Sequence, residues 1–398
     1  MTKGVRCGVA LLVFVLGAAA CGRSALEPAA APAEPLRVAT SGDYAPFTTL
    51  RDGVPAGMDV EVAERLGRDL RLRVELVHVA WPDLVAATQR GEFDVAMGGI
   101  TMRADRALAG RYTRPYATVG AVALIRSGDT RRFAGAADLD RPGVRIAVNA
   151  GGHLEHVARA AFPHAAVEPV ADNRAVPQRL LDGHADAAVT DTAEVRDWLG
   201  PGLQMVGPFS HDHKAYLLPA ANDALAARLD AWLVAREADG WLDAERVRWM
   251  GPQAHMDPAT ATREAVAALV GLRLDPMPSV AAAKRAAGQP IEDRAQEARV
   301  IERVRRLSAT PDRTAAVYGQ LIEMAKTVQQ NAPPPAQSAS LAELRDAITR
   351  VDAQLVRELD RLPPTSTEVW HTALQRSVTT PGVSDEDLNH LAEVLVHP

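Results

Sequence analysis

Two sets of charged side chains have spacings that place them on shared helical faces. Arg273 and Lys284 are eleven residues apart, close to three turns of an α-helix, so one continuous helix would present both cations on the same side. Asp293 and Glu297 follow at a spacing of four, at which side chains on successive turns meet. Cations grouped in this way can hold an anionic small molecule through charge-assisted hydrogen bonds.

A glutamate near the middle of the chain is a candidate acid catalyst. Glu155 opens a predicted helix directly after the turn Gly151-Gly152. Burial in a cleft would favour its neutral form, which can donate a proton. The first turn of a helix would instead favour an ionised carboxylate through the helix dipole. Both interpretations stay open at this point.

The run His211-Asp212-His213 contains two potential metal ligands. It falls on a predicted loop, where alternating positions give a solvated cluster, so we expect no metal there. We expect His153 and His156 at a rim or on a helix surface. The sequence shows no nucleotide-binding loop and no cofactor motif, and we predict neither a metal nor a cofactor.

The composition excludes several classes of protein. The chain has 398 residues, enough for two or three domains, and a net charge of -6, which argues against a nucleic-acid partner. Its two cysteines, Cys7 and Cys21, both lie near the N-terminus. The domains that follow therefore cannot contain an intrachain disulfide or a cysteine-ligated zinc.

Residues 1–21 have the pattern of an export signal. Lys3 and Arg6 precede an apolar run that is too short to span a bilayer, and small residues then meet Cys21. Either ordinary cleavage or lipidation of Cys21 is compatible with this pattern. We predict a periplasmic or exported protein, anchored to a membrane only if Cys21 is lipidated, with an Ala/Pro-rich linker at residues 22–35.

Residues 36–252 alternate short β-like runs with amphipathic helices, which indicates an α/β domain. The predicted strands are 36–40, 74–78, 95–97, 120–125, 145–148, 187–190 and 215–218. The predicted helices are 58–70, 81–90, 153–162, 174–181, 192–199 and 221–238. Turn residues at 127–129 and 141–143 suggest that the chain crosses to a second lobe, and a return crossing near 207–215 would complete a two-lobed cleft.

Residues 257–398 lack strand-like alternation and are predicted to be all α. The predicted helices are 259–274, 279–287, 293–307, 311–330, 341–362, 366–377 and 385–396. Pro333-Pro334-Pro335 cannot continue a helix, so residues 331–339 should connect two long ones.

The first domain resembles periplasmic solute-binding proteins for polar amino acids. The resemblance rests on the runs at 36–47 (LRVATSGDYAPF) and 57–63 (GMDVEVA) and on 93–101 (FDVAMGGIT) followed by Arg106. It implies that Arg106 holds the ligand carboxylate, a task suited to the planar fork of a guanidinium. Arg106 could otherwise belong to a basic surface set with Arg103 and Arg111.

Within this family, residues 149–155 (NAGGHLE) resemble cyclohexadienyl dehydratase, as do Asp172-Asn173, Thr190-Asp191 and the run 214–219 (KAYLLP). The resemblance implies a two-lobed fold of periplasmic binding protein type II. It also implies decarboxylation and dehydration of prephenate to phenylpyruvate, with arogenate as a second substrate, and a proton from Glu155. The implied substrate contacts are Arg106, Thr101, Asn149, Asp191 and Lys214. The last four could instead be cap or hinge residues.

The second domain resembles the all-helical chorismate mutases, and its long C-terminal extension is similar to that of the exported gamma type. The motifs are 280–284 (VAAAK), 288–301 (GQPIEDRAQEARVI) and 325–329 (AKTVQ). The resemblance implies that Lys284 and Gln329 flank the ether oxygen of chorismate, while Glu297 contacts its hydroxyl. The implied substrate-binding residues are Arg273, Asp293 and Arg345.

The sequence departs from the mutase pattern at two positions. Gln296 stands where the family usually has an arginine, and Ala325 stands where a small hydroxyl residue is common. Losing the guanidinium removes a charge-assisted contact, so either substrate affinity falls or a neighbour such as Arg299, about 60° away on the helix, substitutes.

We therefore predict an exported bifunctional enzyme that makes prephenate from chorismate and then dehydrates it. Two alternatives remain: a solute-binding lipoprotein for an amino acid or organic anion with a helical interaction domain, and a dehydratase with an inactive mutase domain. The resemblance implies trimers for the dehydratase domain and dimers for the helical mutase domain, so we expect a homo-oligomer. A hexamer that combines trimeric and dimeric contacts is one closed arrangement.

Overall fold

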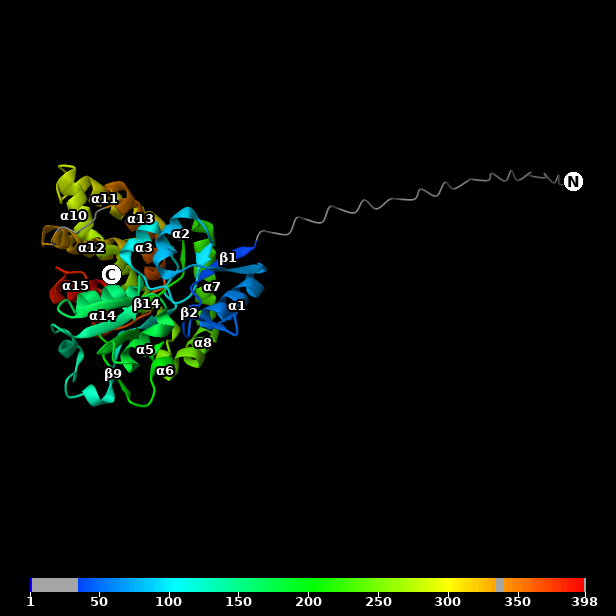
Figure 1. Ribbon diagram of the computed structural model, residues 1–398. Helices are drawn as coiled ribbons and strands as arrows, with labels where there is room; N and C mark the ends of the chain where they lie inside the picture. The colour runs from blue at the N-terminus through cyan, green and yellow to red at the C-terminus, as the bar shows by residue number, and fades with distance from the viewer. Residues whose placement is uncertain (2–34, 332, 334–338, 397–398) are drawn as a thin grey trace. The chain divides into compact units, whose positions relative to one another are not determined.

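The computed structural model describes residues 1, 35–331, 333 and 339–396, which Figure 1 draws as helices, strands and loops. Residues from Pro35 onward form one compact unit. The predicted signal peptide and linker lie, apart from Met1 and Pro35, outside the described residues. The same holds for most of the predicted connection at 331–339.

The first sheet has five strands in the order β5-β1-β6-β15-β7. Strand β1 pairs in parallel with β5 and β6, while β15 runs antiparallel to β6 and β7. Because β15 comes late in the chain, the predicted return crossing is confirmed. The strand bounds are β1 Leu36–Thr40, β5 Val74–His78, β6 Val95–Ala96, β7 Gly110–Tyr112 and β15 Leu217–Pro219.

The second sheet also has five strands, in the order β11-β10-β12-β9-β13. Strand β10 pairs in parallel with β11 and β12, and β9 runs antiparallel to β12 and β13. Parallel strands end at the same edge of a sheet, so the last residues of β10 and β12 lie close together. The bounds are β9 Ala121–Arg126, β10 Arg145–Asn149, β11 Ala166–Val170, β12 Ala187–Asp191 and β13 Leu203–Val206.

Two short strands carry the chain between these sheets. β8 (Ala117–Val119) leads out of the first sheet, β14 (Asp212–Lys214) leads back, and the two pair antiparallel. The prediction that residues 211–213 form a solvated loop is therefore wrong. Pairing with β8, nearly a hundred residues earlier in the chain, makes a strand of a polar sequence that has no local strand signal.

Eight α-helices belong to this part of the chain. In α1, Met58, Val62, Ala63 and Leu66 are buried, as expected from the helical repeat. A small hairpin sheet precedes α1 and consists of β2 Asp43–Tyr44, β3 Thr48–Arg51 and β4 Val54–Ala56. The helix bounds are α1 Met58–Leu70, α2 Leu84–Arg90, α3 Ala104–Ala109, α4 His153–Ala161, α5 Val176–Leu181, α6 Val195–Trp198, α7 Asp223–Ala238 and α8 Trp241–Met250.

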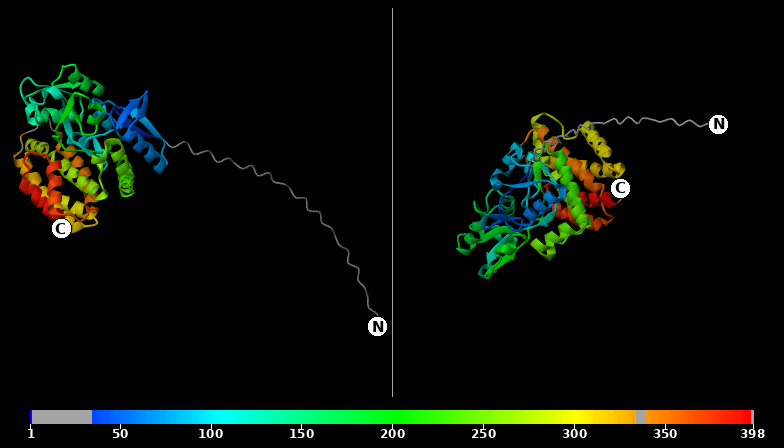
Figure 2. Two further views of the ribbon diagram at one scale, coloured as in Figure 1. Left: turned by 90° about the horizontal axis from the view of Figure 1, so that it is seen from below. Right: turned by 90° about the vertical axis from the view of Figure 1, so that its right-hand side faces the viewer.

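The rest of the described chain is helical, as predicted, and its helices gather in one group (yellow to red in Figure 2). Caps mark where helices begin. Asp257 accepts the backbone N–H of Thr260 at 2.7 Å, and Ser340 and Glu343 cap each other's backbone reciprocally. The bounds are α9 Pro258–Leu274, α10 Met277–Ala286, α11 Arg294–Leu307, α12 Pro311–Asn331, α13 Leu341–Leu359, α14 Thr367–Ser377 and α15 Asp385–Val396.

The two halves share a hydrophobic cluster. It joins residues of the first sheet and its helices, such as Ala39 and Phe93, to the buried faces of α9, α12 and α13. The stretch 258–286 is apolar enough to cross a membrane, but 78% of its most apolar window is buried inside the protein. Its apolarity is thus accounted for by its place in the core.

A buried ion pair links α7 and α8, the last two helices of the first half. Arg246 on α8 is 0% exposed and forms a two-pronged pair with Glu237 on α7, at 2.6 and 2.8 Å. Its guanidinium also donates to the backbone carbonyls of Tyr116, at the start of β8, and Met256, just before α9. Arg246 therefore joins the crossover strand to the start of the helical half.

We predict that Arg246→Met lowers the free energy of unfolding by about 3–5 kcal/mol, because the substitution leaves the Glu237 carboxylate buried without its partner. Urea denaturation followed by circular dichroism measures this change. Arg248→Ala serves as the control, since Arg248 pairs with Glu245 at the surface and should cost no more than about 1 kcal/mol. Equal effects of the two substitutions would show that the buried pair has no special role.

Candidate functional site

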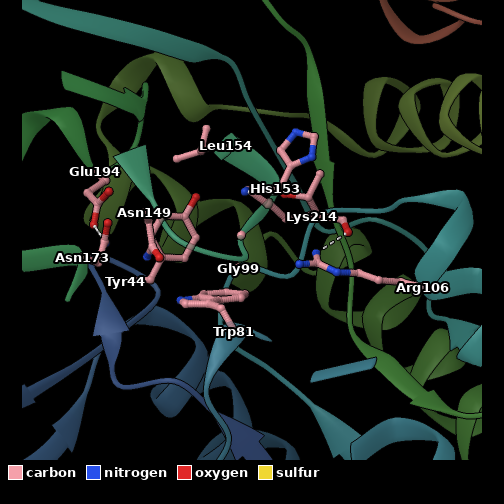
Figure 3. Close-up of a pocket in the computed structure, with 12 residues that line it drawn as sticks. Tyr44, Trp81, Gly99, Arg106, Asn149, His153, Leu154, Asn173, Glu194 and Lys214 are labelled. Carbon is pink, nitrogen blue, oxygen red and sulfur yellow. Dashed lines mark hydrogen bonds between the residues drawn. The ribbon is translucent and has the colours of Figure 1, made fainter. Parts of the chain in front are cut away.

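A cavity lies where the two sheets meet. It receives side chains from the end of β10, from the segment that follows β12, from strand β2 and from the return strand β14 (Figure 3). Glu194 and Asn173 lie on one side, Arg106 lies on the opposite side, and the ring of Trp81 lies between them. The lining residues are Tyr44, Trp81, Gly99, Thr101, Arg106, Asn149, Gly152, His153, Leu154, Asn173, Glu194 and Lys214.

Two buried cations face this cavity. Lys214 donates from Nζ to Thr101 Oγ1 at 2.8 Å, and Arg106 donates from Nη1 to the Thr101 backbone oxygen at 3.0 Å. The guanidinium also lies 6.0 Å from the ring centroid of Trp81. Burial lowers the pKa of Lys214, although the negative charge of Asp191 opposes this shift. The structure thus brings Arg106, Lys214 and Thr101 together in an arrangement that can hold an anion.

Asp191 lies behind the cavity wall. It is 0% exposed, and its Oδ1 accepts the backbone N–H groups of Ala193 and Glu194 at 2.9 and 3.0 Å. Its Oδ2 accepts the hydroxyl of Tyr44 and lies 3.6 Å from Lys214 Nζ. Both carboxylate oxygens are therefore engaged within the protein. In this state Asp191 positions the residues around it and does not line the cavity.

Glu194 is a site residue that our sequence analysis missed. It is 1% exposed, and its oxygens accept Asn173 Nδ2 at 2.6 Å and Thr190 Oγ1 at 2.7 Å. Desolvation and the nearby charge of Asp191 raise the pKa of Glu194 well above its ordinary value, against the opposing effect of these two hydrogen bonds. A carboxyl group that is neutral near pH 7 can donate a proton. The sequence feature that could have identified Glu194 is its position three residues after Asp191, just beyond the motif Thr190-Asp191.

Glu155 is not among the residues that line the cavity. It accepts the backbone N–H of Gly151 at 2.8 Å and pairs with Arg159, one turn along α4, at 2.8 Å. Partial desolvation favours the neutral form, but these hydrogen bonds outweigh it and lower the pKa of Glu155. The expectation that burial keeps Glu155 neutral is therefore wrong, because the side chain turns back to the start of its own helix.

His153 lines the cavity together with Asn149, so its expected position at a rim or helix surface is wrong. Its Nε2 lies 3.0 Å from Asp212 Oδ1 on β14. Burial lowers the pKa of His153, although Asp212 opposes the shift. His156 lies one turn further along α4, partly exposed, with its Nε2 2.7 Å from Arg103 Nη2.

The cavity is narrow in this conformation, with about 30 Å³ of free space. That volume accommodates only one or two water molecules. Contacts across it hold it closed, because Tyr44 bonds to Asp191 and Asn173 donates to the backbone oxygen of Asp43 at 3.0 Å. A substrate with an aromatic-sized ring must therefore separate these groups in order to enter.

A second cavity, of about 120 Å³, lies among α9 to α13 in the helical half. It brings together all six residues that the sequence singled out there, which come from five different helices or their caps. These residues are Arg273, Lys284, Asp293, Glu297, Gln329 and Arg345. Because α9 ends at Leu274 and α10 begins at Met277, Arg273 and Lys284 reach the same cavity from two successive helices.

A buried carboxylate holds two cations at this second cavity. Asp352 is 0% exposed, its Oδ1 accepts Arg273 Nε at 2.9 Å, and its Oδ2 accepts Arg303 Nη2 at 2.7 Å. Arg303 lines the cavity and was not singled out from the sequence. Tyr318 supports the group, since its hydroxyl donates to the Asp352 backbone oxygen at 3.1 Å.

The polar groups facing Arg273 are poorly satisfied within the protein. Lys284 Nζ donates to the backbone oxygen of Ile291 at 2.6 Å, and its pKa is lowered by desolvation and by the charge of Arg345. Gln329 donates to the backbone oxygen of Ala325 at 3.0 Å, and its Oε1 is buried without a hydrogen-bond partner among the described residues. Lys284 and Gln329 can therefore gain hydrogen bonds from a ligand.

Gln296, at the position of the expected arginine, lines this cavity. Its Oε1 accepts Arg299 Nη2 at 2.8 Å, and Arg299 is not among the lining residues. Arg303 lies seven residues after Gln296, on nearly the same face of α11. Among the described arginines of α11, Arg303 lines the cavity and Arg299 does not.

Comparison with protein families gives two separate matches. Residues 36–252, more than half of the chain, match the bacterial extracellular solute-binding proteins, family 3. Residues 264–330 match chorismate mutase type II. The first match covers both sheets and the first cavity, and the second covers α10, α11 and most of α9 and α12.

Individual relatives fall within the first match. Cyclohexadienyl dehydratase of Pseudomonas aeruginosa is 36% identical over 229 residues, which are 55% of this chain and 85% of that protein. The L-cystine-binding protein of Escherichia coli K12 is 26% identical over 221 residues, 54% of this chain and 82% of the relative. The crystal structure of an ancestral amino acid-binding protein, described as a precursor of cyclohexadienyl dehydratase, is 28% identical, with a TM-score of 0.52, and covers 54% of this chain and 95% of that one.

The sheet topology, the cavity at the junction of the sheets and these matches lead to one conclusion. Over residues 36–252 the chain belongs to the bacterial extracellular solute-binding proteins of family 3, and a chorismate mutase type II region follows.

Proposed function

We propose that this chain is a bifunctional enzyme whose helical half converts chorismate to prephenate and whose family 3 half converts prephenate to phenylpyruvate. The observation that carries the proposal is Glu194, a buried carboxyl group that lines the same cavity as Arg106 and Lys214 and whose pKa burial raises. Holding a solute requires cations but no acid, whereas expelling a hydroxyl group requires a proton donor. The product of the first reaction is the substrate of the second, which supports the same assignment.

The dehydratase reaction needs one proton and no covalent intermediate. The bond from the ring to its carboxylate breaks, and its electron pair completes the aromatic ring. The ring hydroxyl takes the proton of Glu194 and leaves as water, while carbon dioxide departs and phenylpyruvate remains. Arg106 and Lys214 hold the substrate carboxylates, with Thr101 and Asn149 as neutral contacts. Trp81 and Tyr44 offer flat faces to the ring, and arogenate would give phenylalanine by the same steps.

The mutase reaction is a rearrangement that depends on positioning and electrostatics. Arg273 and Arg345 hold the two carboxylates of chorismate. Lys284 and the amide of Gln329 stabilise the charge that develops on the breaking ether oxygen. Asp293 and Glu297 lie at the hydroxyl end, where Glu297 accepts the substrate hydroxyl. Asp352 acts through Arg273 by fixing the direction of its guanidinium.

Export of the protein is the expected setting for these activities. Family 3 comprises extracellular solute-binding proteins, and the N-terminal sequence has the pattern of an export signal. We propose a periplasmic or exported enzyme, anchored to a membrane if Cys21 carries a lipid. Assembly into a homo-oligomer, such as a hexamer built from trimeric and dimeric contacts, is part of this proposal.

We predict that Glu194→Gln lowers the kcat of prephenate dehydration by about 10²- to 10⁴-fold, because glutamine fills the same space but donates no acidic proton. Turnover of purified prephenate to phenylpyruvate, followed by absorbance, measures the change. The wild-type kcat should also fall as the pH rises through the raised pKa of Glu194, since only the protonated form is active. Glu194→Gln should lose this alkaline limb.

Glu155→Gln is the matched control for this prediction. Glu155 pairs with Arg159 outside the cavity, so the substitution should leave kcat within about tenfold of the wild type. If Glu155→Gln abolishes turnover and Glu194→Gln does not, then Glu155 is the acid. If the wild type retains prephenate without forming product, the family 3 half is a solute receptor.

For the mutase, we predict that Lys284→Ala lowers kcat/KM for chorismate by at least about 10²-fold, the usual cost of removing one preorganised donor from a developing oxyanion. Loss of chorismate absorbance gives the rate. The control is Arg285→Ala, because Arg285 is the next residue of α10 and is exposed.

Gln296→Arg distinguishes a weak mutase from an inactive one. Adding a guanidinium to the cavity wall should lower KM in an active enzyme. An inactive wild type that gains activity from Gln296→Arg would show that the helical half has lost its mutase function.

Full mutase activity of the Lys284→Ala variant would contradict the assignment of the second cavity as the mutase site.

A further inference from the structure

A cluster of two histidines and one glutamate joins the two halves of the chain. His213 lies on β14, His211 is the residue just before this strand, and Glu264 lies on α9. Successive residues of a strand point to opposite sides, so His211 and His213 share one side of β14. Asp212 and Lys214 share the other side, which faces the first cavity.

Both imidazoles converge on the same carboxylate oxygen. His211 Nε2 lies 2.9 Å and His213 Nε2 lies 3.0 Å from Glu264 Oε2, and the two ring centroids are 5.0 Å apart in an edge-to-face arrangement. His213 is 6% exposed, and the side chain of Glu264 is 13% exposed. Burial opposes the charge of Glu264, but hydrogen bonds from His211 and His213 outweigh it and hold its pKa well below its ordinary value.

We propose that His211, His213 and Glu264 bind a divalent transition metal, for which zinc is the natural probe. Two imidazoles and one carboxylate form a donor set that zinc accepts. Ligand atoms about 2.0–2.1 Å from a tetrahedral zinc ion stand roughly 3.3 Å apart, and these three atoms already lie within 4.8 Å of one another. On binding, each histidine would carry its proton on Nδ1 and present Nε2 to the metal.

The surroundings leave room for an ion and for a further ligand. His211 and His213 line a cavity of about 530 Å³ that also receives His156 and Asp275. A metal held by three protein atoms keeps its fourth position for water or an exogenous group. The two histidines line this cavity and Glu264 does not, so an ion would reach the cluster from the histidine side.

Metal binding at this site would tie β14 to α9, and thus the family 3 half to the helical half. The same strand carries Lys214, whose Nζ donates to Thr101 at the first cavity. Occupancy would therefore fix the strand that supplies one of the cavity's cations. This inference rests on the ligand geometry alone and does not depend on the proposed enzymatic function.

The test is zinc binding to the full chain, purified without a histidine tag, stripped with EDTA and then freed of EDTA. Isothermal titration calorimetry should give one Zn²⁺ per chain, and Co²⁺ should give the visible absorption of a low-coordinate site. Zn²⁺ should also raise Tm, because it binds only the folded arrangement. His211→Ala and Glu264→Gln should each weaken zinc binding by at least about tenfold.

His164→Ala is the matched control, since His164 forms a surface pair with Asp140 and should not change zinc affinity. His211 is the more exposed of the two histidines, so its replacement is the least disturbing to folding, and circular dichroism checks that each variant is folded. Absence of stoichiometric zinc binding by the wild type would overturn the proposal. Equal zinc affinity in the wild type and in folded His211→Ala would overturn it as well.

Discussion

The buried carboxylate of Asp191 is the interaction on which the first cavity depends. It joins the end of β12 to the hairpin strand β2 through Tyr44, lies next to Lys214 and accepts two backbone N–H groups from the residues that follow β12. A charge in a water-poor site is stable only with such partners. Its negative charge opposes the loss of the proton from Glu194 and favours the charged form of Lys214. One aspartate thus acts on the pKa of both Glu194 and Lys214, for each of which desolvation is the larger cause of the shift.

The helical half uses a similar arrangement. Asp352 is fully buried between Arg273 and Arg303, and Tyr318 holds its backbone. In both cavities a buried carboxylate lies next to cations that line the cavity, and in the second cavity Asp352 is itself a lining residue. The two cavities thus share one electrostatic arrangement, in which fixed charges face the space that a ligand would occupy. Gln296 gives the second cavity an amide where the mutase pattern has an arginine.

The fold could be predicted from the sequence wherever the signal is local. β1, β5, α1 and α15 have the bounds expected from their hydrophobic periodicity and turn residues. Edge strand β11 was missed because it is half-exposed and contains Pro169, and such a strand has no alternating pattern. β14 was missed because its partner is far away in the sequence.

The site was predictable to a different extent in each half. All six residues chosen in the helical half line one cavity, although they come from five helices or their caps, because the mutase motifs and not a shared helical face identified them. In the first half Arg106, Thr101, Asn149 and Lys214 line the cavity, but Glu194 and His153 were not expected there. Burial is the largest cause of both pKa shifts, and it depends on tertiary packing that has no local signal in the sequence. Arg303 was missed for the same reason, since Asp352, its partner, lies 49 residues away.

The most direct measurement supplies the full chain with chorismate as its only substrate and follows chorismate, prephenate and phenylpyruvate together over time. The account predicts that chorismate disappears, that prephenate rises and then falls, and that phenylpyruvate finally equals the chorismate consumed. Prephenate that accumulates without conversion would contradict the assignment of the first cavity. Chorismate that is bound but never consumed would contradict the assignment of the second.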